Sequence, residues 1–438
     1  MGKTKPGKQT ETKLKRIRQL SGENSGIKFK WLMPHFNKES LIGCFNELDG
    51  SKAVGVDGQT KKEYRTNLEE NIENLIEKMK KMACRPASVR EVLIPKEGQQ
   101  GKFRPLGISY FEDKLVQLMT SKILEAIFEP LFRDCSHGFR PNRSCHTAVK
   151  ALNNHLHSNQ CEVVIDVDLE NFFGTIDHEL LIKALRVKIE DDRFIRYVIR
   201  MLKAGVLSDG DLKITDEGTL QGSIVSPILS NIFAHYAFDR WFEEVIQPKT
   251  RMPVKCIRYC DDIVICCRYR SDAKDILKVL KIRLEKVSLK LNVAKTKLFD
   301  FSQVNFRKGQ RQETFDFLGF SFYLAWSVGG NVTVKLKTCS KRLRSKLRKV
   351  KDWIKANRHK EKLKPLWITF RLKLRGHGHY YGVSHNIEGV RRFYQEAVRI
   401  FFKWINRRSQ RKSMIWEQFN KFIQKYPAPR AKVYQSLF

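Results

Sequence analysis

The sequence lacks the long apolar segment that a membrane protein needs. The longest apolar run that we find, from Ile263 to Cys267, is far shorter than the ~20 residues of a membrane-spanning helix. The basic N-terminus contains no apolar core of a secretory signal, and Pro6 stands where a myristoylation signal requires Ser or Thr. We therefore expect a soluble, intracellular protein.

Paired cysteine motifs are also missing. None of the ten cysteines forms a C-x-x-C pair, even in the group at positions 256, 260, 266 and 267. Cys266 and Cys267 are adjacent in an expected strand, so their side chains point to opposite faces and cannot chelate one ion. The sequence thus predicts reduced, mostly buried thiols instead of a disulfide framework or a zinc site.

Acidic residues are scarce beside basic ones, with 47 Asp and Glu against 83 Lys and Arg and a formal net charge of +36. Residues 335–438 contain 29 basic and 5 acidic residues, and residues 1–30 contain 9 and 2. A nearly balanced centre between strongly basic ends is typical of a catalytic body with extensions that bind a polyanion. Such binding would be salt-sensitive. The alternative is a merely solvated basic surface.

The length suggests about three domains, and no solenoid-like repeat is evident. Residues 1–30 lack apolar periodicity and predict a flexible arm with at most a short helix near residues 14–20. Helical spacing predicts helices within the following segments: residues 31–81, 113–132, 178–202, 226–242 and 273–287. The C-terminal part is expected to be all-helical, with a turn at the glycines of residues 374–381.

Short β-rich segments lie between these helices. Residues 89–95 and 103–108 predict a hairpin, and residues 315–322 predict a further strand. Two more strands, residues 254–259 and 263–267, flank the pair Asp261 and Asp262. The organisation is therefore α+β.

Carboxylates accompany two of these strands. Along residues 162–168, apolar side chains alternate with Asp166 and Asp168, which share the opposite face. A buried strand that presents carboxylates is costly unless a cation lies nearby. If folding brings Asp168 to Asp261 and Asp262, three hard oxygen ligands would suit Mg²⁺, and a pair of such ions serves in-line displacement at phosphorus. The alternative for an isolated Asp-Asp pair is a solvated acidic turn.

Tyr259-Cys260-Asp261-Asp262 resembles the Tyr-x-Asp-Asp box of reverse transcriptases. Other segments resemble motifs of group II intron-encoded reverse transcriptase/maturases, in the same order. They are residues 55–58, 94–96, 104–108, 137–143, 168–173, 221–231, 292–296, 317–320 and 374–381. The resemblance covers about residues 40–438 and is to the compact form without a C-terminal HNH endonuclease domain. Second-strand cleavage is therefore not expected.

The resemblance implies a right-hand polymerase with fingers, a palm with a small antiparallel sheet, and an all-helical thumb. It assigns a basic, flexible N-terminal arm to residues 1–30 and the fingers with an N-terminal extension to residues 31–160. The catalytic palm takes residues 161–330, and the basic thumb/maturase domain that binds RNA takes residues 335–438.

The resemblance also implies roles for individual residues. Asp168, Asp261 and Asp262 are expected to be catalytic and to bind two Mg²⁺ ions, for which Mn²⁺ is an expected substitute. The family spacing selects Asp168, five residues before Phe173, and leaves Asp166 a supporting or ion-paired role. The residues expected to contact the nucleotide are Lys96, Arg104, Phe173, Gln221 and Lys295. Those expected to contact RNA or primer are Tyr259, Gly222, Arg140, Arg143, Lys341, Arg342, Arg344, Lys346 and Arg375.

Among the nucleotide-binding residues, Phe173 is expected to exclude a 2′-hydroxyl and so select deoxynucleotides, with core Phe as the alternative for either Phe172 or Phe173. Three positions depart from the family pattern. Gly174 stands where Asp is frequent, Leu220 where Pro is usual, and Cys260 where Ala is common, beside the primer terminus.

The function that the resemblance implies is RNA-directed DNA synthesis together with intron-RNA binding and splicing assistance for retrohoming. The expected partners are structured intron RNA, a DNA primer or target and dNTPs, in a bacterial or archaeal cytosol, with the nucleoid as the site of work on DNA. A monomer and an RNA-bound dimer both stay open. Two alternatives are an intron-independent domesticated or defence-associated reverse transcriptase and a splicing-only maturase.

Overall fold

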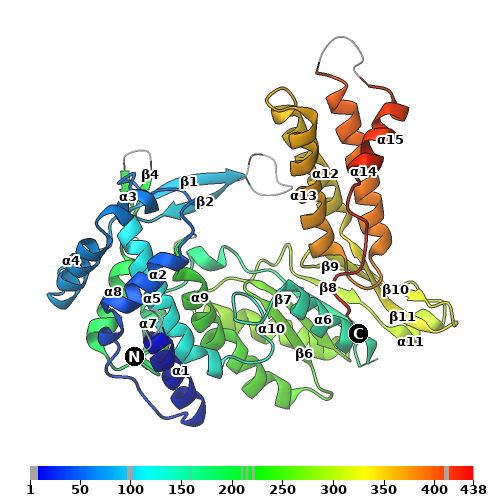
Figure 1. The fold of residues 1–438 in the computed structure, drawn as a ribbon. Helices are drawn as coiled ribbons and strands as arrows, with labels where there is room; N and C mark the ends of the chain where they lie inside the picture. Colours follow the sequence, from blue (N-terminus) through cyan, green and yellow to red (C-terminus); the bar gives the residue numbers. More distant parts are fainter. Residues whose placement is uncertain are drawn as a thin grey trace.

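The computed structural model describes residues 8–95, 101, 103–158, 160–208, 211–213, 216–219, 222–408 and 414–437. Helices surround three small sheets, and a helical bundle projects from one side of the body (Figure 1). This mixture of helices and mainly antiparallel sheets confirms the α+β class. In the described part of the chain, every helix is too short or too polar to cross a membrane.

A four-stranded antiparallel sheet lies at the centre of the body. Its spatial order is β6 (Lys255–Tyr259), β7 (Asp262–Cys267), β3 (Val163–Val167) and β8 (Lys297–Asp300). One face packs against α10 (Arg270–Glu285) and the other against α6 (Cys145–His157). Because both faces are covered, β3 and β7 are almost continuously apolar.

A second sheet has the order β2-β1-β4-β5. The hairpin of β1 (Val89–Pro95) and β2 (Phe103–Ile108) has the bounds that the sequence predicts. The pair β4 (Val206–Ser208) and β5 (Asp211–Lys213) was not predicted, because three-residue strands have too few positions to show alternation.

The N-terminal segment differs from the flexible arm that the sequence predicts. Residues Lys8–Glu23 form one helix, α1, which packs against α5 (Phe111–Phe128). Ile17 is buried, and the Ser21 hydroxyl donates a 2.6 Å hydrogen bond to the carbonyl of Ile127. The narrow apolar face of α1 is stabilised by this tertiary contact, which the weak periodicity of the segment did not reveal.

Helices make up most of the remaining body. The predicted helix at residues 178–202 is two helices, because Asp191 caps the second one by accepting a 3.0 Å hydrogen bond from the amide of Phe194. The helices are α2 (Lys38–Glu47), α3 (Lys61–Thr66), α4 (Leu68–Lys80), α7 (His178–Arg186), α8 (Asp192–Leu202), α9 (Ser226–Ala234) and α11 (Gln303–Arg307).

The third sheet connects the body to the bundle. The expected strand at residues 315–322 is divided into β9 (Phe315–Phe317) and β10 (Phe320–Trp326), because Leu318 and Gly319 both have positive φ angles. β10 pairs with β11 (Val332–Thr338), so the segment from residue 335 begins as a strand and is not all-helical. The bundle follows as α12 (Ser340–Asn357), α13 (Leu363–Tyr381), α14 (Ile387–Ile405) and α15 (Trp416–Lys425).

The turn expected at the glycines of residues 374–381 is wrong, because α13 continues through them to Tyr381. A Cβ atom at Gly378 would overlap the hydroxyl of Tyr394 on α14. This glycine therefore permits two helices to approach closely. Gly376 has open space around its Cβ position.

All ten cysteines are free thiols, and seven of them are buried. This confirms the prediction of reduced, mostly buried thiols.

Candidate active site

The three predicted aspartates come from two neighbouring strands. Asp262 is the first residue of β7, and Asp261 lies in the tight turn before it. Asp168 directly follows β3, whose last residue, Val167, pairs with Ile263. The antiparallel register therefore brings Asp168 and Asp262 to the same end of the sheet.

Mutual repulsion is evident among these carboxyl groups. Dense surroundings raise the pKa of Asp262 to about 7, and the charges of Asp261, Asp166 and Asp168 add to the effect. Burial also raises the pKa of Asp261, which the positive charge of Arg104 partly offsets. Asp166 has a pKa raised to about 6 by burial and by Asp168. The four carboxyl groups therefore share one electrostatic environment.

The donor set fits divalent cations, although the described residues contain no group of three or more His, Cys, Asp or Glu side chains already arranged to hold one. Carboxylate oxygens are the ligands that Mg²⁺ prefers. The repulsion that raises the pKa of Asp262 is relieved when a cation neutralises these charges. Asp168, Asp261 and Asp262 are the residues that would hold it.

Basic side chains from three elements approach the carboxylates. Lys295 lies before β8, and its Nζ is 3.3 Å from Oδ1 of Asp168. Arg104 of β2 is exposed and acts on the pKa of Asp261, while Arg342 of α12 lowers that of Asp262. Of the other predicted nucleotide ligands, Lys96 and Gln221 lie outside the described residues.

The two phenylalanines after Asp168 have different surroundings. They lie in a short 3-10 helix, Phe172–Gly174, with ring centroids 5.4 Å apart. Phe172 is buried in the core at 3% exposure, whereas Phe173 is only partly buried. This leaves Phe173 as the ring available to a substrate, in agreement with the register that the sequence favours.

Gly222 and Tyr259 lie close to the same region. Gly222 has a φ of 103°, and a Cβ atom there would be 2.7 Å from the carbonyl oxygen of Gly107 in β2. Only glycine fits this contact. Tyr259 ends β6, and its partly buried ring lies 6.3 Å from that of Phe139.

The expectation that Arg140 contacts RNA does not fit the structure. Its side chain is 4% exposed, forms an ion pair with Glu129 at 3.0 Å and donates to the carbonyls of Arg133 and Ser136. Arg143 likewise donates to Asp134 and to the carbonyl of Ser136. Both guanidinium groups brace the loop at residues 133–143. Motif resemblance could not distinguish such internal bracing from phosphate binding.

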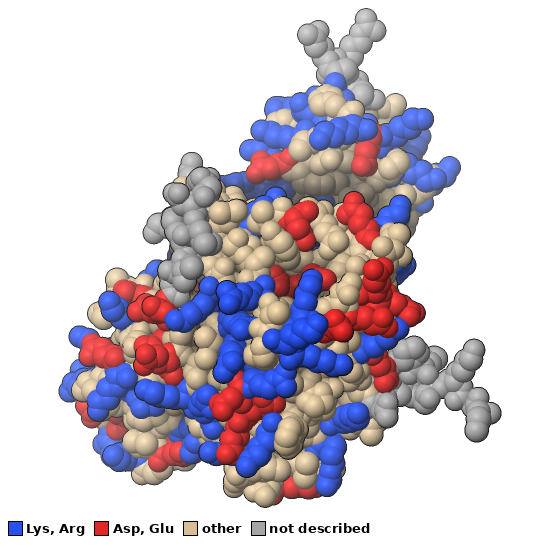
Figure 2. Space-filling view, turned by 90° about the vertical axis from the view of Figure 1, so that its left-hand side faces the viewer, with Lys and Arg blue, Asp and Glu red and all other residues tan. Residues whose placement is uncertain are grey.

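The other predicted RNA ligands lie on the bundle. Lys341, Arg342 and Arg344 on α12 and Arg375 on α13 are exposed, and Lys346 is partly buried. In Figure 2, the upper part of the molecule, which the bundle forms, shows mainly Lys and Arg, whereas the body mixes both charges. The uneven charge of the sequence thus corresponds to one structural unit.

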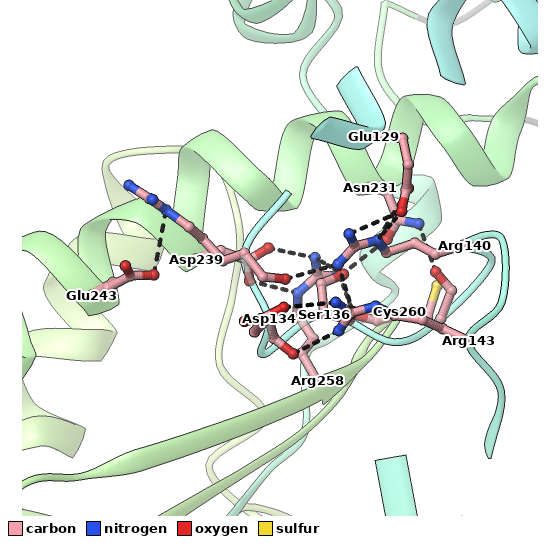
Figure 3. A network of polar contacts seen from close by, with 12 residues as sticks. Glu129, Asp134, Ser136, Arg140, Arg143, Asn231, Asp239, Glu243, Arg258 and Cys260 are labelled. Carbon is pink, nitrogen blue, oxygen red and sulfur yellow. Dashed lines mark hydrogen bonds and ion pairs between the residues drawn. The ribbon is translucent and has the colours of Figure 1, made fainter. Parts of the chain in front are cut away.

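Sequence reasoning missed the arginine that precedes the Tyr-x-Asp-Asp box. Arg258 is 1% exposed on β6 and forms an ion pair with Asp239 (Figure 3). An arginine inside an otherwise apolar strand was the available signal, because buried charges require a partner.

A sheet that presents three aspartates at one end, beside a basic helical bundle, defines the class as a nucleic-acid polymerase. Residues 94–322 match the family described as reverse transcriptase (RNA-dependent DNA polymerase). The chain belongs to this family, which confirms the resemblance seen in the motifs.

Several intron-encoded proteins are similar to the chain. Group II intron-encoded protein LtrA of Lactococcus lactis subsp. cremoris is 35% identical over 255 residues, which are 56% of this chain and 42% of LtrA. Protein YkfC of Escherichia coli (strain K12) is 32% identical over 281 residues, 57% of this chain and 73% of YkfC. A putative COX1/OXI3 intron 2 protein of Saccharomyces cerevisiae is 42% identical over 146 residues, 33% of this chain and 17% of that protein. The matched part of the chain thus spans less than half of LtrA.

Proposed function

We propose that the chain is an RNA-directed DNA polymerase that extends a primer on an RNA template by two-metal phosphoryl transfer. The observation that supports this best is the position of Asp168, Asp261 and Asp262 at one end of the central sheet. Membership of the reverse transcriptase family supports the same reaction.

In this proposal the three aspartates hold two Mg²⁺ ions. When bound, such ions activate the attacking primer hydroxyl and neutralise the charge on the leaving pyrophosphate. Arg104 orients the triphosphate, with Lys96 from the same hairpin. Lys295, now paired with Asp168, donates a proton to the pyrophosphate. Phe173 selects the sugar.

The proposal assigns the parts of a right hand to the elements of the fold. The β1–β2 hairpin and its helices form fingers over residues 31–160, and the central sheet belongs to a palm over residues 161–330. The helices α12 to α15 form a thumb within residues 335–438. Its charge supports binding of RNA and of the template–primer duplex through phosphates.

We further propose that the RNA partner is a structured intron, whose splicing and retrohoming the protein assists in the cytosol and, on DNA, at the nucleoid. The names of the intron-encoded relatives support this partner. The alternatives are an intron-independent reverse transcriptase and a splicing-only maturase. Intron RNA domains in the DNA on both sides of the reading frame would favour the intron partner over the first alternative.

The test combines primer extension with splicing. Wild-type protein should extend a DNA primer on an RNA template with Mg²⁺ and should accelerate splicing of the intron RNA. Asp261→Ala should abolish extension while leaving the thermal unfolding midpoint and splicing assistance near wild type. Extension by a folded Asp261→Ala protein at the wild-type rate would refute the assignment of the site. Splicing without any wild-type extension would leave only the maturase.

A further inference from the structure

The guanidinium group of Arg258 uses every one of its donors inside the protein (Figure 3). Nε and Nη2 donate to the two carboxylate oxygens of Asp239 at 2.7 and 2.6 Å. Nη1 donates to Oδ1 of Asn231 at 3.2 Å and to the carbonyl of Cys260 at 3.1 Å. Nη2 also donates to the hydroxyl of Ser136 at 2.8 Å. These five bonds match the five N–H groups of an arginine.

One of these acceptors belongs to the aspartate turn itself. Cys260 is buried and has a φ of 61°, a left-handed conformation that non-glycine residues rarely adopt. Its carbonyl oxygen accepts from Arg258, and Asp261 and Asp262 follow directly. A strained backbone persists only where its surroundings hold it in place. Arg258 supplies a hydrogen bond that holds this one.

The loop at residues 133–143 encloses the same turn from the other side. The amide of Arg258 donates to the carbonyl of Cys135 at 2.7 Å, and the amide of His137 donates to the carbonyl of Arg258 at 2.8 Å. A Cβ atom on Gly138 would be 2.6 Å from the amide nitrogen of Cys260. Asn231 joins this loop to the network by donating to the carbonyl of Gly138 at 2.7 Å.

Asp239 completes the network from a helix. It is fully buried at the end of η4 (His235–Asp239), a π-helical turn that continues α9. Such widened turns are frequent at functional sites. The buried pair is poorly explained by stability alone, since well-packed apolar residues often replace such a pair without loss of stability. What apolar residues cannot supply is a donor to the Cys260 carbonyl.

We propose that Arg258, held by Asp239, is a positioning residue that sets the backbone of the turn carrying Asp261 and Asp262. The ion pair orients the guanidinium, and the guanidinium orients the Cys260 carbonyl. This inference rests on the proposed function for its effect on catalysis. Its effect on the backbone of the free protein does not depend on that function.

The first experiment measures hydrogen–deuterium exchange in the free full-length protein. Arg258→Lys keeps the charge but cannot supply the same fork of donors. Arg258→Met combined with Asp239→Leu replaces the pair by apolar side chains. Both variants should exchange faster than wild type at residues 256–264, with unchanged exchange at residues 178–202. Unchanged exchange at residues 256–264 in both variants would overturn the proposal.

The second experiment measures steady-state kinetics on a primed RNA template. Both variants should lose about 10–100-fold in kcat, the range for residues that orient metal ligands. Their KM for dNTP should stay within about threefold of wild type, because the nucleotide contacts are untouched. Wild-type kcat in a folded double variant would overturn the proposal. If wild-type protein extends no primer, the proposed function fails, and the exchange experiment still decides the inference.

Two further variants separate positioning from general destabilisation. Asp191→Ala removes a buried carboxylate that accepts from the amides of Leu32 and Phe194, remote from the turn. It should lower the unfolding midpoint and leave kcat unchanged. Ser136→Ala removes one acceptor of Arg258 and keeps the ion pair, so it serves if the larger changes prevent folding. It should lower kcat less, in the same direction, and an unchanged kcat together with unchanged exchange would overturn the proposal.

Discussion

Phe172 and Phe173 show how two identical neighbouring residues acquire different roles. The first ring is buried in the core, and the second is only partly covered. Nothing in a Phe-Phe pair distinguishes its members, but the 3-10 turn that contains them directs them differently. The partly covered ring is the one that a nucleotide sugar can meet.

We predict that Phe173→Val admits ribonucleotides, because the smaller side chain leaves space for a 2′-hydroxyl. The ratio of kcat/KM for dATP to that for ATP should fall by about 10–100-fold. Phe172→Val is the matched control. It should lower stability through a core cavity and leave this ratio unchanged. A ratio that changes only in the Phe172 variant would show that the register is misplaced by one residue.

Asp113 gives the molecule a pH dependence away from the active site. It is buried at the start of α5, where Oδ2 accepts a 3.0 Å hydrogen bond from the amide of Ala87. Burial raises its pKa to about 7, with smaller contributions from Glu112 and Asp57. The folded state therefore binds a proton more tightly than the unfolded state. Its contribution to stability is lost as the pH rises from about 4 to about 7.

We predict that Asp113→Asn is more stable than wild type at pH 8, by about 1–3 kcal/mol, because it removes a buried charge. At pH 4 the advantage should disappear, since the wild-type carboxyl is then protonated. Urea unfolding of both proteins across this range measures the difference, and other titrating groups cancel between them. A difference that stays constant from pH 4 to pH 8 would contradict the raised pKa.

The contact between α13 and α14 depends on one glycine. Two glycines in a helix suggest a break when the sequence is considered alone, since each costs roughly 0.5–1 kcal/mol relative to alanine. In the structure, Gly378 faces Tyr394 of the neighbouring helix, while Gly376 faces open space. Helix packing therefore retains a residue that helix propensity disfavours.

We predict opposite effects for two matched substitutions in α13. Gly378→Ala should destabilise the protein by about 1–3 kcal/mol, because its methyl group overlaps the Tyr394 hydroxyl. Gly376→Ala should stabilise it by roughly 0.5–1 kcal/mol through helix propensity. Thermal and urea unfolding measure both. Equal effects of the two substitutions would show that α13 and α14 are not in close contact at Gly378.

Charge is the property that distinguishes the bundle from the rest of the molecule. Residues 335–438 contain 29 of the 83 basic residues and only 5 acidic ones. The bundle also shares a core with β10 and β11, so cutting the chain near residue 330 would expose apolar side chains as well as remove charge. Charge substitution on the intact chain is therefore the better experiment.

We predict that Lys341→Glu, Arg344→Glu and Arg348→Glu together weaken RNA binding and reduce its dependence on salt. For every phosphate that the protein no longer neutralises, the slope of log K against log salt becomes shallower by about 0.7–0.9. The matched control makes the same charge change on exposed residues of α3 and α4, at Lys62, Lys78 and Lys80. Filter binding between about 50 and about 300 mM salt compares the two. Equal losses of affinity in both proteins would mean that only the net charge matters.

Local patterns were sufficient to predict the central strands, the β1–β2 hairpin, most helices and the three aspartates. Alternation and helical spacing act over a few residues, and a metal-binding turn needs a short, recognisable set of side chains. The same reasoning was wrong for α1, for the glycines in α13 and for the role of Arg140. In each case a partner distant in the sequence decides the outcome.

Arg258 shows the physical reason most clearly. Its acceptors, Ser136, Asn231, Asp239 and Cys260, come from a loop, two helical segments and a turn. A charge can be buried only where enough acceptors converge, and that convergence depends on packing between segments up to 122 residues apart. The residue types at the active site are therefore readable from the chain, whereas the network that holds their backbone exists only after the chain has folded.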